Sequence, residues 1–191
     1  MDPIERFKQM AKVSSTTVVE LEKESDVIDY LKSIEPEEKK PIVPDKREPQ
    51  LDKKILGTWN IAEELIEKIQ QDNDFWVVKN SFRQYLGGLD FGLFWADFAV
   101  ANTGTLIVKS FSEDLRILTM FSEINVVFLN PEDIVLDFEE CAQDLNNYLS
   151  GGGFVSFITG PSRTADIERV LTLGVHGPWE VHVVLLSQEQ A

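Results

Sequence analysis

The sequence predicts an α/β protein whose strands form a layered sheet, and two observations support this class. Short apolar runs rich in β-branched and aromatic residues follow one another in mid-chain, separated by Gly, Asn, Ser and Asp, which is typical of strands. Strand–helix–strand patterns flank this block, and the last strands are almost continuously apolar, as in a sheet buried on both faces. The runs of the block are Leu89–Asp97, Phe98–Val100, Thr105–Val108, Ile117–Phe121 and Ile124–Leu129.

The first fifty residues predict a charged arm. Apolar residues three and four apart favour helices at Pro3–Lys12 and Ser25–Ile34, and the β-branched stretch Thr17–Leu21 favours a strand. Residues 35–50 hold four prolines and many charges, a composition that predicts a linker. We therefore divide the chain into an N-terminal helical, charged arm with a linker (residues 1–50), packed in part on the body, and an α/β domain (residues 51–191).

The remaining elements alternate between helices and strands. A helix is predicted over Leu51–Gln71, because Ile61, Leu65 and Ile69 share one face of its second half. A helix over Pro131–Ser150 carries acids near its start, where the helix dipole favours them, and ends at three glycines. We also expect strands at Phe75–Val78, Phe154–Ile158 and Val181–Leu186, and a helix at Thr164–Leu171.

Charge and cysteine content exclude several classes of function. The formal net charge is −15, and residues 51–191 hold 9 Lys and Arg against 21 Asp and Glu, a balance of −12. Such a body repels a phosphate backbone, so nucleic-acid binding is set aside. The one cysteine, Cys141, supports neither an internal disulfide nor an iron–sulfur cluster, and its helical pattern favours a core position. We find no signal peptide and no membrane-spanning run, and expect a cytoplasmic protein without a membrane span.

The stretch Gly160–Glu168 is the first candidate site. An apolar strand ends where it begins, and a helix is expected to start near Ser162 or Thr164. Free backbone N–H groups and the positive end of a helix dipole favour an anion there, and the Arg163 guanidinium can clamp a carboxylate or phosphate. The structural alternative is that Ser162 or Thr164 caps the helix while Arg163 pairs with Asp166. No nucleotide-binding motif is present.

A second candidate is His176, which lies between Gly174 and Gly177. Glycines on both sides allow the backbone to approach a ligand closely. The alternative is a tight loop whose imidazole binds a neighbouring carbonyl. His182 lies in a strand pattern and is assigned a structural role, and two histidines without a carboxylate cluster predict no metal site.

A third candidate is the turn Ala101–Leu106 between two strands. Asn102, Thr103 and Thr105 surround Gly104, and short polar side chains around a glycine suit hydrogen bonding to a ligand. They suit a β-turn equally well.

Three stretches together resemble one family. They are Ala96-Asp97-Phe98 with Thr103-Gly104-Thr105-Leu106, then Arg116-Ile117-Leu118-Thr119, and finally Gly160-Pro161-Ser162-Arg163-Thr164-Ala165-Asp166-Ile167-Glu168 with Gly174-Val175-His176-Gly177-Pro178. In these residues the chain is similar to the lactate utilisation protein C family, the small single-domain branch of the LUD-domain proteins. The resemblance runs from about Leu89 to Leu186, and its last motif is the most specific.

This resemblance implies the fold of ribose-5-phosphate isomerases, glucosamine-6-phosphate deaminases and CoA transferases (the NagB/RpiA/CoA transferase-like fold). It also implies a role in oxidising L-lactate to pyruvate beside two iron–sulfur partner proteins. Lactate oxidation needs an electron acceptor, and a chain with one cysteine and no dinucleotide motif does not easily hold one. We therefore expect a non-redox subunit without a cofactor of its own.

The chain departs from the family pattern at three positions. The family usually carries Glu where this chain has Asn102, and Pro and His where it has Ser122 and Asn125. These changes remove two titratable groups from the expected cleft. Whether the chain is an enzyme is therefore left open: the alternatives are an independent enzyme on a phosphosugar isomerase or acyl-transfer scaffold, and a non-catalytic binding or regulatory module.

We predict one site for a small carboxylate or phosphate ligand. In it His176 carries protons and Asp166 orients Arg163. The residues expected to bind the ligand are Thr103, Gly104, Thr105, Gly160, Ser162, Arg163 and Thr164.

Overall fold

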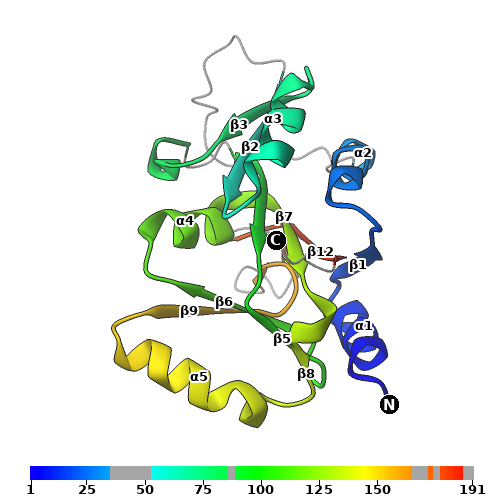
Figure 1. Ribbon diagram of the computed structural model, residues 1–191, viewed down its shortest axis with the longest axis vertical. Coiled ribbons are helices and arrows are strands. Elements are labelled where there is room, and N and C mark those ends of the chain that lie inside the picture. The colour runs from blue at the N-terminus through cyan, green and yellow to red at the C-terminus, as the bar shows by residue number, and fades with distance from the viewer. Residues whose placement is uncertain (35–52, 86–88, 165–171, 174–176, 187–191) are drawn as a thin grey trace.

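The computed structural model describes residues 1–34, 53–85, 89–164, 172–173 and 177–186, which form two sheets, a two-stranded ribbon and the helices that cover them (Figure 1). In chain order the elements are α1 Pro3–Val13, β1 Thr17–Glu20, η1 Glu24–Asp26, α2 Val27–Ser33, β2 Lys54–Trp59, α3 Glu63–Gln71, β3 Phe75–Val78, η2 Phe82–Tyr85, β4 Leu89–Trp95, β5 Phe98–Val100, β6 Thr105–Ser110, α4 Glu113–Phe121, β7 Ser122–Leu129, η3 Pro131–Asp133, β8 Ile134–Val135, α5 Phe138–Ser150, β9 Phe154–Ile158, β10 Arg163–Thr164, β11 Thr172–Leu173 and β12 Glu180–Leu185.

The main sheet has six strands in the order β1-β12-β7-β4-β2-β3. Every neighbouring pair in it is parallel. The central strands β4 and β7 are almost entirely buried, because both faces of the sheet are covered. The predicted α/β class with a layered sheet is thereby confirmed.

Each face of the main sheet has its own apolar core. Alternate residues of a strand point to opposite faces, so Phe94 enters one core and Phe91 the other. Helices α2 and α3 cover the second core through Val27, Leu31, Leu65, Ile66 and Ile69. Helices α1 and α4 and the smaller sheet cover the first, through residues that include Phe7, Ala11, Leu115, Leu118, Ala99 and Leu106.

The smaller sheet has the order β8-β5-β6-β9, in which β6 is antiparallel to both of its neighbours. It lies with α5 at one end of the molecule, away from α3 and β3 (Figure 1). Cys141 and Leu145 of α5 pack on Val100 and Ile107 of this sheet. The core position predicted for Cys141 is confirmed, since its thiol is free and buried.

Helix α4 packs against Gly57 of the main sheet, and two polar side chains donate hydrogen bonds to carbonyls at its C-terminal end. A Cβ at Gly57 would overlap the Leu118 side chain, so the bare glycine allows α4 to approach the sheet. At the end of the helix, Ser122 Oγ donates to the Leu118 carbonyl (2.6 Å) and Asn125 Nδ2 to the Thr119 carbonyl (2.9 Å). The Leu118 carbonyl also accepts from the Ser122 N–H, so the Ser122 hydroxyl adds a second bond to it, while Asn125 satisfies the Thr119 carbonyl in the last turn of the helix.

Two segments form a different secondary structure from the one predicted. The helix predicted over Leu51–Gln71 is wrong in its first half, where Lys54–Trp59 forms β2, and is helical only at Glu63–Gln71. The strand predicted over Ile117–Phe121 is wrong, because these residues complete α4. That helix begins with Ser112, whose side chain accepts a hydrogen bond from the Asp114 N–H.

Two predicted helices begin differently from the expectation. Residues 131–137 are a 3₁₀ turn followed by β8, and α5 begins at Phe138. The helix predicted from Thr164 is wrong at its start, because β10 (Arg163–Thr164) pairs antiparallel with β11 (Thr172–Leu173); residues 165–171 lie outside the described residues. In the part of the chain that is described, no helix has the length and apolarity needed to cross a membrane.

Candidate functional site

Three threonine hydroxyls form a row at one end of the smaller sheet. Thr105 begins β6, Thr159 follows β9, and the register of the two strands places these residues opposite each other. Thr103 Oγ1 donates to Thr105 Oγ1 over 2.8 Å, and Thr105 Oγ1 lies 2.8 Å from Thr159 Oγ1. Thr105 is buried while Thr103 and Thr159 are exposed. These three residues, called the hydroxyl row below, are therefore open to solvent at both ends.

Two glycines beside the hydroxyl row contact the end of helix α1. Gly104 has φ 65°, and a Cβ there would lie 2.7 Å from the Ala11 nitrogen. Gly160 has φ 79°, and a Cβ there would overlap the carbonyl oxygen of Ser14. Both positions need glycine, for the left-handed backbone and for the contact. The neighbour that approaches them closely is the end of α1.

The loop 160–162 joins the hydroxyl row to residues 177 and 178, which belong to the second predicted turn. The Ser162 N–H donates to the Pro178 carbonyl over 2.8 Å, and a Cβ at Gly177 would lie 3.0 Å from the Ser162 Cβ. Residues from all three predicted turns are thereby brought together. Since Ser14 and Pro178 precede β1 and β12, this junction lies towards the amino ends of those strands, whereas ligands of parallel sheets usually bind at carboxyl ends.

Four of the predicted site residues are described only in part or not at all. Asp166 and His176 lie outside the described residues. For Arg163 and Thr164 the structure describes the backbone, which is extended and paired with β11. The helix N-terminus that motivated an anion site at these two residues is therefore replaced by strand pairing, and the roles of all four side chains stay predictions.

Asn102 ties the turn of the hydroxyl row to two helices. Its Oδ1 accepts from Arg6 Nε of α1 (3.0 Å), and its Nδ2 donates to Asp137 Oδ1 just before α5 (2.7 Å). An amide serves both partners because it is donor and acceptor at once. A carboxylate in its place would suit Arg6 and repel Asp137, so the amide gives this chain a structural link at that position.

Comparison with known proteins decides the family. The family model described as LUD domain matches residues 4–186. The chain belongs to the LUD domain family. The match includes α1, the hydroxyl row and the loop 160–162, so the family resemblance seen in the sequence is confirmed.

Several curated relatives of this LUD domain carry the name Lactate utilization protein C. The one from Geobacillus kaustophilus is 29% identical over 100 residues, which are 50% of this chain and 42% of the relative. The one from Exiguobacterium sp. is 32% identical over 101 residues, 51% of this chain and 44% of the relative. The matched segment thus spans less than half the length of these relatives.

One solved structure has the same fold. It is a DUF162 family protein from Deinococcus radiodurans, which aligns with a TM-score of 0.65 at 13% sequence identity and covers 97% of this chain and 96% of its own. At this identity the likeness supports the α/β fold of the LUD domain and nothing beyond it.

Two of the positions at which this LUD domain departs from the family pattern serve helix α4. Ser122 and Asn125 are 1% and 0% exposed, so neither reaches solvent in this conformation. Both donate to the last carbonyls of α4, and Asn125 Oδ1 has no partner among the described residues. Their observed roles are therefore structural.

A relay of three side chains links α2 to β12 and was not foreseen from the sequence. Tyr30 Oη lies 2.7 Å from His182 Nδ1, and His182 Nε2 lies 2.9 Å from Glu180 Oε2. A carboxylate only accepts, so Nε2 carries a proton, and in the neutral imidazole Nδ1 then accepts from the Tyr30 hydroxyl. Burial, and then the charge of Glu180, raise the pKa of Tyr30 to about 12. Only the strand position of His182 could be expected from the sequence.

A second unforeseen group surrounds Lys109 on the smaller sheet. Its ammonium lies 3.0 Å from Asp144 and 3.6 Å from Asp97, and above the rings of Phe98 and Tyr148. Burial raises the pKa of Asp97 although the Lys109 N–H and ammonium oppose this. For Lys109 burial disfavours the charge, but Asp144 and Asp97 outweigh it and raise the pKa of the ammonium. The group fixes α5 to the sheet.

The hydroxyl row suits binding and orientation. Hydroxyls donate to and accept from a polar ligand and can pass protons by rotation, but they supply no charge. Acid–base chemistry at this junction would need the predicted His176 or Asp166. Within the described ranges, no group of three or more His, Cys, Asp or Glu side chains is placed to hold a metal ion.

Proposed function

We propose that this LUD domain is a cytoplasmic, non-redox subunit of a lactate-utilisation system that binds a small carboxylate at the hydroxyl row. The observation that carries the proposal is the LUD domain match over residues 4–186, together with relatives named Lactate utilization protein C. The junction of the three predicted turns supports the choice of this site for the ligand. Lactate and pyruvate each carry one carboxylate, which accepts hydrogen bonds from hydroxyl groups.

The redox centre is assigned to partner proteins. Oxidising lactate to pyruvate releases two electrons and two protons, which an acceptor must take up. Iron–sulfur clusters are held by about four cysteines, whereas this chain has one, the buried Cys141. We therefore propose that iron–sulfur proteins of the same system accept the electrons.

The proposed division of roles keeps the predicted residues and adds Thr159. Thr159 and Ser162 donate hydrogen bonds to the carboxylate, Thr103 does so when its hydroxyl turns away from Thr105, and Arg163 supplies the positive charge. Asp166 orients Arg163, and His176 carries the proton of the lactate hydroxyl. Anion binding at an acidic chain depends on such a local cation, since the net charge of −15 repels anions at long range.

The whole system is tested by lactate-dependent dye reduction in extracts of a host strain. Extract from a strain that lacks this protein should lose the activity, and adding the purified protein should restore it. An extract that reduces the dye equally with and without the protein would refute the proposed role.

Ligand binding is tested separately on the purified protein. Thermal unfolding is followed with lactate, pyruvate, inorganic phosphate and coenzyme A. We expect lactate or pyruvate to raise the midpoint, because a ligand bound to the folded state stabilises it. Thr103→Val and Thr159→Val should remove this rise. Ser150→Ala, which removes an exposed hydroxyl at the end of α5, should leave it unchanged. A rise that both threonine variants retain would place the ligand elsewhere.

A further inference from the structure

The smaller sheet carries exposed apolar residues at its β9 edge, in the part of the chain that the structure describes. Strand β9 is its edge strand, with β6 as the one neighbour within the described residues. Phe154 and Phe157 of β9 are 44% and 53% exposed, and Phe138 and Leu149 of α5 are 37% and 49% exposed. The Phe138 and Phe157 rings meet edge to face at 5.8 Å. Phe157 therefore lies on the α5 face of the smaller sheet, and Phe154, three positions earlier on the same strand, lies on the opposite face. We call these four residues the edge strip, because they border the β9 edge from its two faces; exposed apolar surface of this kind marks interaction sites.

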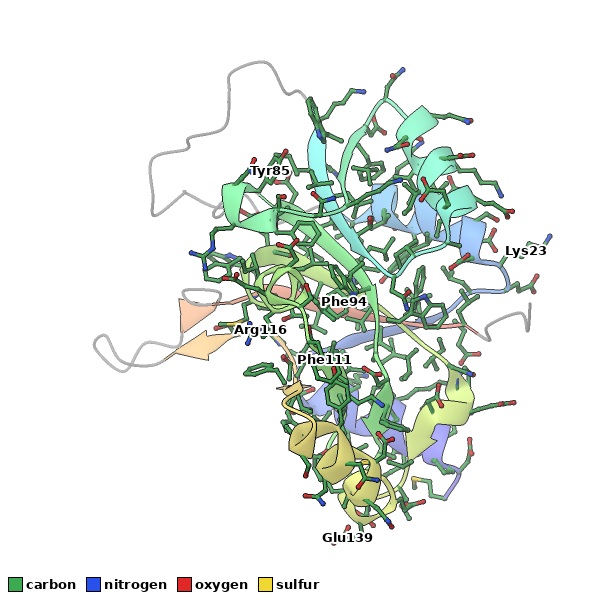
Figure 2. All side chains as sticks on the ribbon, turned by 60° about the vertical axis from the view of Figure 1, so that its left-hand side comes forward. Lys23, Tyr85, Phe94, Phe111, Arg116 and Glu139 are labelled. Atoms are coloured by element: carbon green, nitrogen blue, oxygen red, sulfur yellow. The ribbon has the colours of Figure 1, made fainter. Side chains whose placement is uncertain are left out.

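Aromatic surface continues beside the edge strip. The Arg116 guanidinium of α4 lies 5.1 Å from the centre of the Phe154 ring. Phe111 is 69% exposed and packs on Tyr148 at 4.6 Å. Figure 2 shows Arg116 and Phe111 on the same side of the molecule, above α5. Aromatic residues and arginine are enriched in the centres of protein interfaces.

No described strand pairs with the backbone of β9 on the side away from β6. The Ile107 carbonyl accepts from the Asp97 N–H, and the Lys109 N–H donates to the Asp97 side chain, so residues 107 and 109 direct their backbone groups away from β9. Phe157 and Val155 stand opposite them in the register. In an antiparallel ladder opposite residues alternate between bonded and open pairs, so the N–H and C=O groups of Val155 and Phe157 point to the free edge.

The edge lacks the usual protection. Exposed edge strands are normally guarded by lysine, proline or an inward-pointing charge. Strand β9 reads Phe-Val-Ser-Phe-Ile and holds none of these. An unguarded edge with exposed phenylalanines is a surface built for pairing with another strand.

We propose that the edge strip binds a second copy of this chain, with the two β9 strands antiparallel about a two-fold axis at Ser156. In this arrangement Phe154 of one copy stands opposite Ile158 of the other, and Val155 stands opposite Phe157. Each apolar residue of the strand then meets an apolar residue, with the small Ser156 on the axis. The strand is therefore its own complement, as a two-fold interface requires.

Helix α5 extends the same complementarity. Phe138 and Leu149 are eleven residues apart, about three helical turns, so they lie on one face of α5. Because the two-fold axis reverses the direction of α5, Phe138 of one copy lies towards Leu149 of the other. The two helix dipoles run antiparallel, which is the favourable arrangement.

The exposed area indicates a reversible dimer. From their exposed fractions, the four side chains offer on the order of 350 Å² per copy, whereas a stable interface buries about 800 Å² per partner. Backbone pairing, Phe111 and Arg116 supply part of the difference. The net charge of −15 on each copy opposes association, so salt should strengthen the dimer by screening this repulsion.

Sedimentation velocity tests the proposal over protein concentrations from about 1 to about 300 µM. We expect a reversible monomer–dimer equilibrium whose dissociation constant falls as NaCl rises from about 0.05 to about 0.5 M. A chain that stays monomeric over the whole range would overturn the proposal. A dimer that salt dissociates would also overturn it, because such an interface would depend on ion pairs.

Two variants locate the interface. Ser156→Lys places like charges on the axis and should raise the dissociation constant about tenfold or more. Phe157→Lys changes an exposed side chain, should leave the fold intact, and should have the same effect. The matched control is Trp76→Lys on β3, the edge strand of the main sheet, whose side chain is 46% exposed. A dimer that both β9 variants retain, or that Trp76→Lys dissociates, would refute pairing through β9.

Discussion

Replacing Tyr30 by Phe removes one hydroxyl from the relay that links α2 to β12 and keeps the ring in place. His182 Nδ1 then loses its donor at 2.7 Å, while His182 stays only 7% exposed. A buried acceptor without a donor costs about 1–3 kcal/mol. We therefore expect Tyr30→Phe to lower the free energy of unfolding by about 1–3 kcal/mol near neutral pH.

The same substitution should change the response to alkali. The pKa of Tyr30 is about 12 in the folded protein and about 10 in an unfolded chain. Between these values the folded state holds a proton that the unfolded state has released, so stability falls as pH rises from about 10 to about 12. A fully buried group would lose about 1.4 kcal/mol per pH unit. Because Tyr30 is partly exposed, we expect roughly 1 kcal/mol over the whole window.

Urea unfolding at about pH 9 and about pH 11 measures this loss. Lysine ion pairs also weaken in alkali, so the informative quantity is the difference between the wild type and Tyr30→Phe. The loss between the two pH values should be smaller in the variant by roughly 0.5 kcal/mol, because pH 11 reaches only about half of the window. Tyr85→Phe on η2, away from the relay, should lose as much as the wild type. An equal loss in the wild type and Tyr30→Phe would refute the reasoning.

Three further substitutions test other parts of the structure by urea unfolding. Gly160→Ala should lower the free energy of unfolding by about 2 kcal/mol or more, because φ is 79° and the added Cβ meets the Ser14 carbonyl. The control is Gly152→Ala, where φ is 83° but the space is open, and it should cost only about 1 kcal/mol. Equal costs in the two variants would contradict the α1 contact. Asn102→Leu should cost about 1–3 kcal/mol, since the Arg6 and Asp137 links are lost; a neutral result would contradict this role. Thr58→Val should be neutral or stabilising, because its buried hydroxyl has no partner among the described residues; a clear loss would reveal one.

The strands at the centre of the main sheet could be predicted because burial on both faces leaves a simple pattern. Residues 89–97 and 124–129 are almost continuously apolar, and β4 and β7 lie there. β2 was missed because its apolar residues Ile55 and Leu56 come only a few positions before the apolar stripe of α3. Gly57 and Thr58 were the available signal against a helix. For α4 an apolar run of five residues fits either element, and Ser112 before two acids was the sign of a helix start.

Much of the candidate site could not be predicted because it depends on contacts between distant residues. Thr103, Gly104 and Thr105 were expected to face a ligand, and the structure adds Thr159, 54 residues beyond Thr105, as their neighbour. The contact of α1 with both glycines follows from its docking on the smaller sheet, which no local pattern encodes. The predicted roles of Asp166 and His176 are untested, since both lie outside the described residues.

The strand order has a consequence for how this chain is made. β12 lies between β1 and β7, so the earliest strand of this sheet pairs with the latest. Until residue 185 has been synthesised, β1 lacks the strand that pairs with it among the described residues, and one side of β7 is open. The segment that holds α1 and β1 must therefore wait in an unfinished state while the rest of the sheet is made, and ribosome-bound chains that stop before Glu180 should be protease-sensitive in β1 and α1. Folding of the main sheet is thus completed only after β12 has been synthesised.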